Sequence, residues 1–266
     1  MIVCCCDGSV NGIFTAIYRA WELGTSKTSI CVSEGENMEL FAEYRFIEAD
    51  EEPARKVADS ILHKLSPEIY SYVYRAALSC EADRGDAIYR FLIDAFRVGS
   101  GIINHLVNPH VMRIFELNRT VAREAHKYLG FLRFGQYRDH ERSFLLARFD
   151  PRNNILDIVS HHFADRLMND NWLIADTMRK ICALHHEGSN EYIITPIKDE
   201  YLNTLVEATR EDVRNASPLS NESIEQLWET FRASIAIEPR RNTQLQQQLM
   251  PLRYRTYMNT YSEPAR

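Results

Sequence analysis

The spacing of hydrophobic residues changes along this chain of 266 residues, and that change limits the fold class. Over residues 51–130 hydrophobic side chains recur at intervals of three and four, which is typical of amphipathic helices. Between residues 131 and 197 the pattern changes to short apolar runs around a single helix near residues 155–167. We therefore expect an α+β fold in which a helical layer packs on a small, mostly antiparallel sheet. The expected strands of this sheet are residues 131–137, 143–149, 172–176, 180–185 and 192–195.

The first residues predict a strand, a turn and a helix. Residues 2–6 form a short apolar run that ends at Asp7-Gly8-Ser9, and hydrophobic residues then recur at helical spacing up to Gly24. Backbone N–H groups of a turn formed by Asp7, Gly8, Ser9 and Gly12 are able to contact a phosphate. The sequence here matches neither the dinucleotide fingerprint nor the P-loop, so a plain turn is the alternative that we favour.

The six cysteines indicate burial more than chemistry. Three of them stand together at residues 4–6 in the predicted strand, where cysteine behaves as a small hydrophobic residue. No Cys-x-x-Cys pair or zinc-like spacing with histidine occurs, so we expect no metal and no cofactor.

Composition and length favour a globular protein that acts away from membranes. We expect one domain over residues 1–266, with a helical sub-region at 51–130 and a strand/helix sub-region at 131–197. Two further helices are predicted at about residues 199–215 and 220–236. No run of about 18 apolar residues occurs and the N-terminus lacks the basic flank of a signal peptide, so we expect a cytoplasmic location without membrane insertion.

Charge is unevenly distributed along this acidic chain of net charge -6. Residues 1–52 hold ten acidic and three basic side chains, whereas residues 119–148 hold seven basic and three acidic ones. A second basic segment, residues 238–266, holds five arginines and two glutamates beside Tyr, Asn and Gln. If the two basic segments meet, they form one face suited to phosphates and bases. Pairing of these arginines with the acidic surplus is the alternative.

The sequence His161-His162-Phe163-Ala164-Asp165-Arg166 is the sharpest local grouping of chemical side chains. On a helix, His162 and Arg166 share one face, while His161 and Asp165 share another. His162, Asp165 and Asp176 are our candidate catalytic residues, because an imidazole near a carboxylate can transfer protons near neutral pH. The alternative is structural, with His162 in the core and Arg166 paired to a carboxylate such as that of Asp176.

Several ordered motifs together resemble the bacterial probable DNA metabolism protein family, a domain of unknown function. They are Asp7-Gly8-Ser9 with Gly12, Glu124-Ala125-His126 leading to Gly130–Phe134, His162–Arg166, Trp172 with Asp176 and Arg179, and Arg241-Asn242 through Met250–Tyr254. The chain has Cys6, Ala175 and Arg255 at positions where we expect other residue types. The resemblance implies a DNA repair or modification role beside a radical SAM protein, or beside a uracil-DNA glycosylase-like domain supplied by a separate partner.

We expect the protein to bind DNA as a non-catalytic accessory of such a partner. The residues expected to contact nucleic acid are Arg133, Arg166, Arg179, Arg241, Asn242, Arg253 and Tyr254. The alternatives are an enzyme that acts on nucleic acid through His162, Asp165 and Asp176, and a protein-interaction module.

Overall fold

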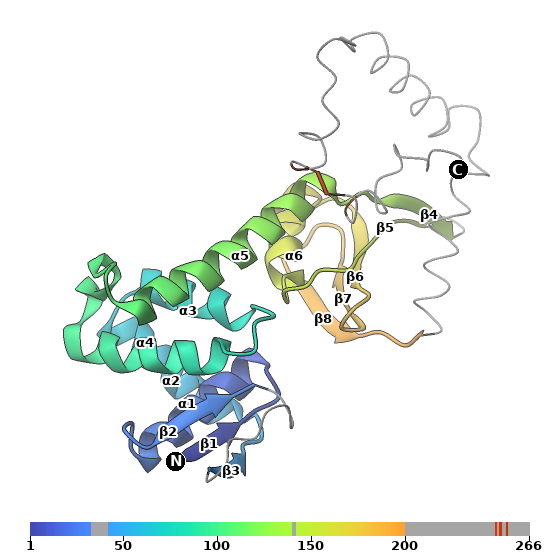
Figure 1. Ribbon diagram of the computed structural model, residues 1–266. Coiled ribbons are helices and arrows are strands. Elements are labelled where there is room, and N and C mark those ends of the chain that lie inside the picture. Colours follow the sequence, from blue (N-terminus) through green and yellow to red (C-terminus); the bar gives the residue numbers. More distant parts are fainter. Residues whose placement is uncertain (33–41, 140–141, 200–247, 249, 252–253, 255–266) are drawn as a thin grey trace. The chain divides into compact units, whose positions relative to one another are not determined.

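The computed structural model describes residues 1–32, 42–139, 142–199, 248, 250–251 and 254 (Figure 1). The chain divides into two compact units. Unit 1 comprises residues 1–124 and 152–154, and unit 2 comprises residues 125–151 and 155–266. The single domain expected from the sequence stays a prediction, and each unit is described by itself below.

Unit 1 is built on a small parallel sheet. Strand β1 (Ile2–Cys5) lies in the centre and pairs in parallel with β2 (Thr28–Cys31) and β3 (Glu43–Phe46). Parallel neighbours need a crossover connection, and α1 (Val10–Leu23) supplies it between β1 and β2. The predicted strand, turn and helix at the N-terminus are therefore present.

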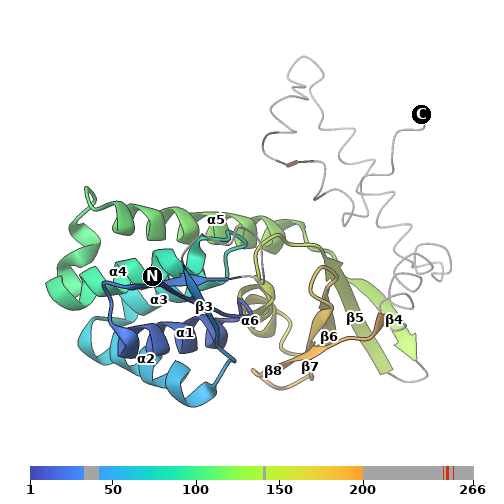
Figure 2. The same cartoon turned by 60° about the horizontal axis from the view of Figure 1, so that its bottom comes forward.

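Helices make up the rest of unit 1, and Figure 2 shows α1 to α4 lying near one another. They are α2 (Glu51–Lys64), α3 (Pro67–Ala77), α4 (Arg84–Val98), the short 3-10 helix η1 (Ser100–Asn104) and the first part of α5 (Pro109–Phe131). Local sequence sets their starts, because the side chains of Ser9, Asp50 and Ser66 accept hydrogen bonds from the first-turn N–H groups of α1, α2 and α3. Their buried faces form a continuous core with Cys4 and Ile30 of the sheet and with Cys6, which follows β1.

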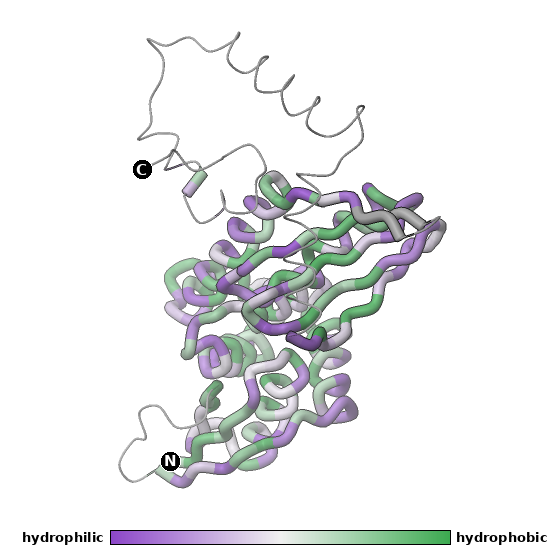
Figure 3. Tube along the Cα trace, turned by 90° about the vertical axis from the view of Figure 1, so that its right-hand side faces the viewer, coloured by the Kyte–Doolittle hydropathy of each residue, from purple (hydrophilic) through white to green (hydrophobic). Residues whose placement is uncertain are grey.

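Unit 2 contains a five-stranded mixed sheet of order β4-β5-β6-β7-β8. Its strands are β4 (Gly135–Asp139), β5 (Arg142–Phe149), β6 (Asn171–Asp176), β7 (Ile181–His185) and β8 (Tyr192–Pro196). All neighbouring pairs are antiparallel except β5 and β6, which run parallel because α6 (Leu156–Arg166) returns the chain between them. Figure 3 shows hydrophobic stretches along this sheet.

Helix α6 covers one face of the sheet over β6, β7 and β8. Val159, Phe163 and Ala164 of the helix are buried, as are Trp172 and Ile174 of β6. At the edge of the sheet, the Tyr192 hydroxyl donates a hydrogen bond to the Asp157 carboxylate at 2.7 Å. Burial raises the pKa of Tyr192 above its ordinary value, and the hydrogen bond to the Asp157 carboxylate raises it further.

The α+β class expected from the sequence is confirmed, and the sheet of unit 2 is mostly antiparallel as predicted. The predicted strand at 131–137 begins late, since α5 continues to Phe131 and β4 starts at Gly135. The two helices predicted between residues 199 and 236 lie outside the described residues. None of the helices in the described ranges is both long enough and apolar enough to cross a membrane.

Candidate nucleic-acid interface

Helix α6 separates an inner apolar face from an outer polar face. Phe163 and Ala164 point to the core, whereas His161, Asp165 and Arg166 are exposed and His162 is half-buried. His161 and Asp165 lie one turn apart, with Nδ1 of the histidine 3.9 Å from Oδ2 of the aspartate. His161 and Asp165 therefore share one exposed face as predicted, whereas Arg166, which was predicted to share the face of His162, is exposed.

The basic segment 119–148 contacts α6 through Phe134. The ring of Phe134 packs edge-on against Phe163, with centroids 5.0 Å apart, and His162 contacts the same ring at 5.2 Å. This contact brings the exposed Arg133 to the same region of unit 2 as His162 and Arg166. We call Arg133, Phe134, His162 and Arg166 the α5–α6 patch.

The two arginines of the α5–α6 patch differ in their bonding. The guanidinium of Arg133 donates to the carbonyls of Gly130 and Leu132, at 2.8 and 3.0 Å, which satisfies free acceptors at the end of α5. Arg166 makes no hydrogen bond or ion pair with another described residue and is exposed. An exposed guanidinium such as that of Arg166 suits a ligand that carries phosphates.

Tyr254 connects the C-terminal basic segment to unit 2. Its ring is 1% exposed and packs edge-on against Tyr128, with centroids 5.0 Å apart. Phe131 lies 5.6 Å from the same ring, and Lys127 places its ammonium 5.4 Å from the ring centroid. Tyr254 is therefore an anchor in the core of unit 2, and its own ring is not available to stack on a base.

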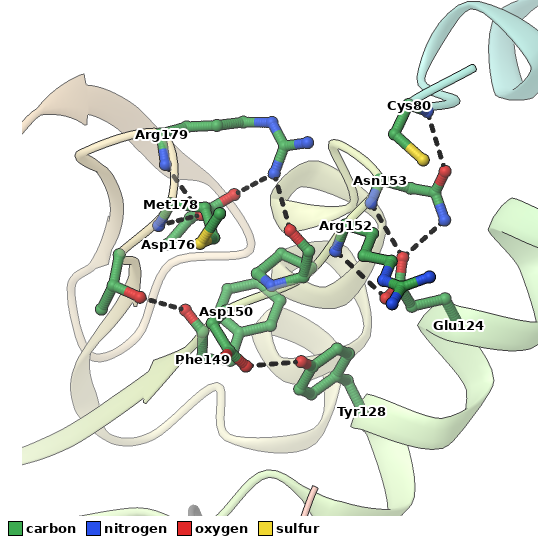
Figure 4. A network of polar contacts seen from close by, with 12 residues as sticks. Cys80, Glu124, Tyr128, Phe149, Asp150, Arg152, Asn153, Asp176, Met178 and Arg179 are labelled. Carbon is green, nitrogen blue, oxygen red and sulfur yellow. Dashed lines mark hydrogen bonds and ion pairs between the residues drawn. The ribbon is translucent and has the colours of Figure 1, made fainter. Parts of the chain in front are cut away.

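Asp176 is fully buried at the end of β6, where it organises the turn into β7 (Figure 4). Its Oδ1 accepts hydrogen bonds from the backbone N–H groups of Met178 and Arg179, and its Oδ2 accepts one from the Arg179 guanidinium at 3.0 Å. The same guanidinium donates to the carbonyl of Pro151. Burial raises the pKa of Asp176 above its ordinary value, and Arg179 opposes this rise by stabilising the carboxylate. This arrangement holds a turn and leaves little of the carboxylate for a substrate.

The carboxyl ends of the parallel strands β5 and β6 hold two groups that sequence reasoning did not select. Asp150 follows β5 and accepts a hydrogen bond from the Tyr128 hydroxyl at 3.1 Å. Thr177 follows β6 and donates both its N–H and its hydroxyl to the carbonyl of Phe149. The sequence does show an acidic residue directly after an expected strand. Such a residue indicates a site only where neighbouring strands are parallel, and hydrophobic periodicity does not reveal strand direction.

Glu124 forms a separate polar network within unit 1. Its buried carboxylate accepts hydrogen bonds from the N–H groups of Arg152 and Asn153 and from the Asn153 side chain. The amide oxygen of Asn153 in turn accepts a hydrogen bond from the N–H of Cys80, as Figure 4 shows. Each group of this network meets a complementary partner, so Glu124 orders a loop.

The N-terminal turn carries its own negative charge. Asp7 Oδ1 accepts hydrogen bonds from the N–H and the hydroxyl of Ser9, at 2.9 and 2.8 Å, and the Ser9 hydroxyl caps α1 by accepting from Gly12 N–H. Gly8 has a φ of 79°, in the left-handed region that favours glycine. The Asp7 carboxylate thus faces the amides that a phosphate would need.

The structure does not join the predicted catalytic residues. No hydrogen bond or ion pair links His162 to Asp165 or Asp176 among the described residues. The expected pairing of Arg166 with Asp176 is wrong, because the partner of Asp176 is Arg179, three residues along the same turn. Of the other predicted contacts, Arg241, Asn242 and Arg253 lie outside the described residues. Within the described ranges, no three His, Cys, Asp or Glu side chains form a metal-binding group.

A family model matches much of the chain. The model of a family described as a domain of unknown function, DUF4130, matches residues 82–259. The matched residues include the α5–α6 patch, Asp176, Arg179 and Tyr254. No curated protein matches the chain.

Proposed function

The chain belongs to the DUF4130 family, and on that premise we propose that it binds nucleic acid as an accessory protein of DNA metabolism. The observation that supports this proposal most strongly is the burial of Tyr254 against Tyr128 and Phe131. It joins Tyr254, one residue of the basic segment 238–266, to two residues of the other basic segment, residues 119–148. We infer that the two segments contribute to one nucleic-acid-binding face; the arginines of residues 238–266 lie outside the described residues.

The α5–α6 patch supplies chemistry that fits this role. Arg133 and Arg166 are exposed, and Phe134 and His162 are half-buried. Phe134 and His162 both contact the ring of Phe163. Guanidinium groups bind phosphate oxygens with paired N–H donors, and flat rings stack on unpaired bases. A single-stranded or locally opened nucleic acid offers both groups.

Bonding at Asp176 favours an accessory over an enzyme. An enzyme acting on phosphodiesters normally presents carboxylates that hold a metal ion, or an acid and a base in contact. Here the most buried carboxylate of unit 2 is bonded to Arg179 and to two backbone N–H groups. The enzyme and the protein-interaction module remain the alternatives that the experiment below must exclude.

The link to DNA, rather than to another polyanion, rests on the ordered motifs of the chain. These motifs resemble the probable DNA metabolism family, whose members occur beside a radical SAM protein or a glycosylase-like domain. We therefore infer a partner of one of these two kinds, which performs the chemistry while this chain holds the nucleic acid.

Fluorescence anisotropy with short DNA at several salt concentrations tests the proposal. Single-stranded, double-stranded and uracil-containing oligonucleotides serve as probes. We expect Arg166→Ala to weaken binding by about threefold to tenfold and to lower the salt slope by about 1, as expected for loss of one phosphate contact. Arg133→Lys keeps the charge and is expected to bind nearly as well as the unchanged protein.

Arg55→Ala is the matched control. Arg55 is an exposed arginine on α2 of unit 1, outside the α5–α6 patch. The proposal fails if no oligonucleotide binds at low salt, or if Arg55→Ala and Arg166→Ala weaken binding equally. Affinity capture with a radical SAM protein and with a uracil-DNA glycosylase then separates the partner hypothesis from direct DNA binding.

A further inference from the structure

Helices α1, α2 and α4 of unit 1 enclose an open groove with a volume of about 550 Å³. Its apolar surface comes from Ile17, Trp21, Val57, Leu92 and Phe96. Pockets for small molecules have volumes of about 300–1,000 Å³ and are mostly apolar with a few polar groups. The size and lining of this groove fall within that description.

Trp21 is the exposed aromatic residue that lines the groove, whereas Tyr18 and Phe96 are half-buried. Its ring is 39% exposed, although its neighbours Tyr89 and Phe96 pack edge-to-face with it at 6.2 and 5.5 Å. These two contacts hold the indole in one orientation. A fixed and partly exposed indole provides a ready surface for a flat apolar group.

The polar side of the groove is a row of residues on α2. Lys56, Ser60 and Lys64 all line it, and their spacing of four residues places them on one face of the helix. Lys56 is neutralised by Glu52, at 2.8 Å, and its ammonium also lies 5.8 Å from the centroid of the Tyr18 ring.

Lys64 is the unpaired charge of the groove among the described residues. No hydrogen bond or ion pair involves its ammonium, whereas the acidic lining residue, Glu22, is paired with Arg19 at 3.1 Å. The groove therefore combines an apolar interior with one positive charge that lacks a negative partner. This charge pattern is complementary to a ligand with an apolar body and a single negative group.

We propose that the groove binds a small aryl carboxylate. The aromatic body packs against Trp21 and Phe96, and the carboxylate is held by Lys64 with the Ser60 hydroxyl beside it. A two-ring molecule is small enough for the groove, and a carboxylate matches the single ammonium without a need for two. This site is independent of the proposed DNA-binding face, which lies in unit 2.

Isothermal titration calorimetry with three matched probes tests the proposal. The probes are naphthalene-2-carboxylate, its amide and 2-naphthylmethylammonium, which share one ring system and differ in charge. We expect the carboxylate to bind more tightly than the amide by about threefold to fivefold, as for an exposed ion pair, and the ammonium to bind most weakly.

Two variants locate the binding. Lys64→Gln is expected to abolish the preference for carboxylate over amide while the amide still binds, and Ser60→Leu is expected to block all three probes by filling the groove. Arg55→Gln, an exposed change on α2 outside the lining, is the control, and circular dichroism checks that each variant folds. Equal binding of carboxylate and ammonium, an unchanged preference in Lys64→Gln, or the absence of saturable binding to the unchanged protein would overturn the proposal.

Discussion

Tyr254 packs edge-to-face against Tyr128, with ring centroids 5.0 Å apart and an interplanar angle of 72°. Tyr128 in turn meets Phe149 at 4.9 Å and 82°. Tyr254, helix α5 and strand β5 thus share one aromatic cluster in unit 2. Since the Tyr254 side chain is almost fully buried in this cluster, we expect it to contribute to the stability of unit 2.

Replacement of Tyr254 by alanine should destabilise the protein. Truncation of a buried aromatic ring costs about 3–5 kcal/mol in free energy of unfolding, because apolar surface is lost and a cavity remains. We expect Tyr254→Ala to lower the stability measured by urea unfolding by about 3 kcal/mol, near the lower end of that range. Tyr254→Phe keeps the ring and should retain most of the stability.

The same variants test the proposed role of the C-terminal segment. If Tyr254 anchors basic residues on unit 2, Tyr254→Ala should weaken DNA binding at temperatures where the protein is still folded, and Tyr254→Phe should not. Unfolding curves of Tyr254→Ala that coincide with those of the unchanged protein would contradict the buried position of the ring.

Asp176→Asn should affect folding more than any reaction. The substitution keeps an acceptor oxygen but removes the negative charge that faces the Arg179 guanidinium. Breaking a buried ion pair on one side costs about 3–5 kcal/mol, and solvent access to Arg179 should bring this to about 2 kcal/mol. Thermal unfolding measures the loss, with Asp165→Asn on the exposed face of α6 as a control that should change little.

The opposite outcome would support the alternative that the protein is an enzyme. Asp176→Asn that unfolds like the unchanged protein, but loses an activity on nucleic acid, would identify the carboxylate as catalytic. His162→Ala helps to distinguish a structural from a catalytic role. His162 is half-buried and makes no hydrogen bond with another described residue, so its replacement should affect folding little and an activity only if the imidazole is catalytic.

The sequence predicted the limits of several strands well, but it did not predict which strands pair or which side chain pairs with Asp176. Strands β6, β7 and β8 begin and end within about one residue of the predicted limits, because short apolar runs between turn residues are a local signal. The pairing of β1 with β3 and of β5 with β6 joins residues far apart in the chain, and periodicity carries no information on it. The partner of Asp176 was also predicted wrongly. The prediction named the distant Arg166, whereas the tight turn after β6 brings the nearby Arg179 to the carboxylate.

Gly12→Ala should disturb the N-terminal turn through Asp7. A Cβ atom at residue 12 would overlap the Asp7 carboxylate oxygen Oδ1, so that side chain would have to move and release Ser9. We expect a loss of stability of about 1 kcal/mol, comparable to loss of the Ser9 cap, and a smaller loss when Asp7 is already alanine. Thermal unfolding of the four proteins of this double-mutant cycle measures the coupling.

The cycle also bears on the predicted phosphate contact at this turn. Because the Asp7 carboxylate is bonded to the Ser9 N–H, added inorganic phosphate should leave the unfolding temperature of the unchanged protein as it is in a sulfate-free buffer. A rise with phosphate that disappears in Ser9→Ala would instead support the phosphate-contacting turn.

The cysteines should differ strongly in reactivity with iodoacetamide at pH 8. Burial raises the pKa of the Cys5 and Cys6 thiols to about 11, so only about one in a thousand of these side chains is the reactive thiolate at pH 8. Cys4 and Cys182 are also buried, and burial raises the pKa of each. Cys80 is the exposed cysteine of the described residues.

We therefore expect Cys80 to be alkylated first in the native protein, and the cysteines of β1 only after unfolding in urea. Peptide mass spectrometry at successive times measures this order, and Cys80→Ser should remove the fast phase. A rise in pH toward 11 increases the thiolate fraction of Cys5 and Cys6, so any native labelling of these residues should increase with pH. Labelling of Cys5 as fast as Cys80 at pH 8 would show that the thiols of the central strand are chemically active, against the structural role that the buried strand indicates.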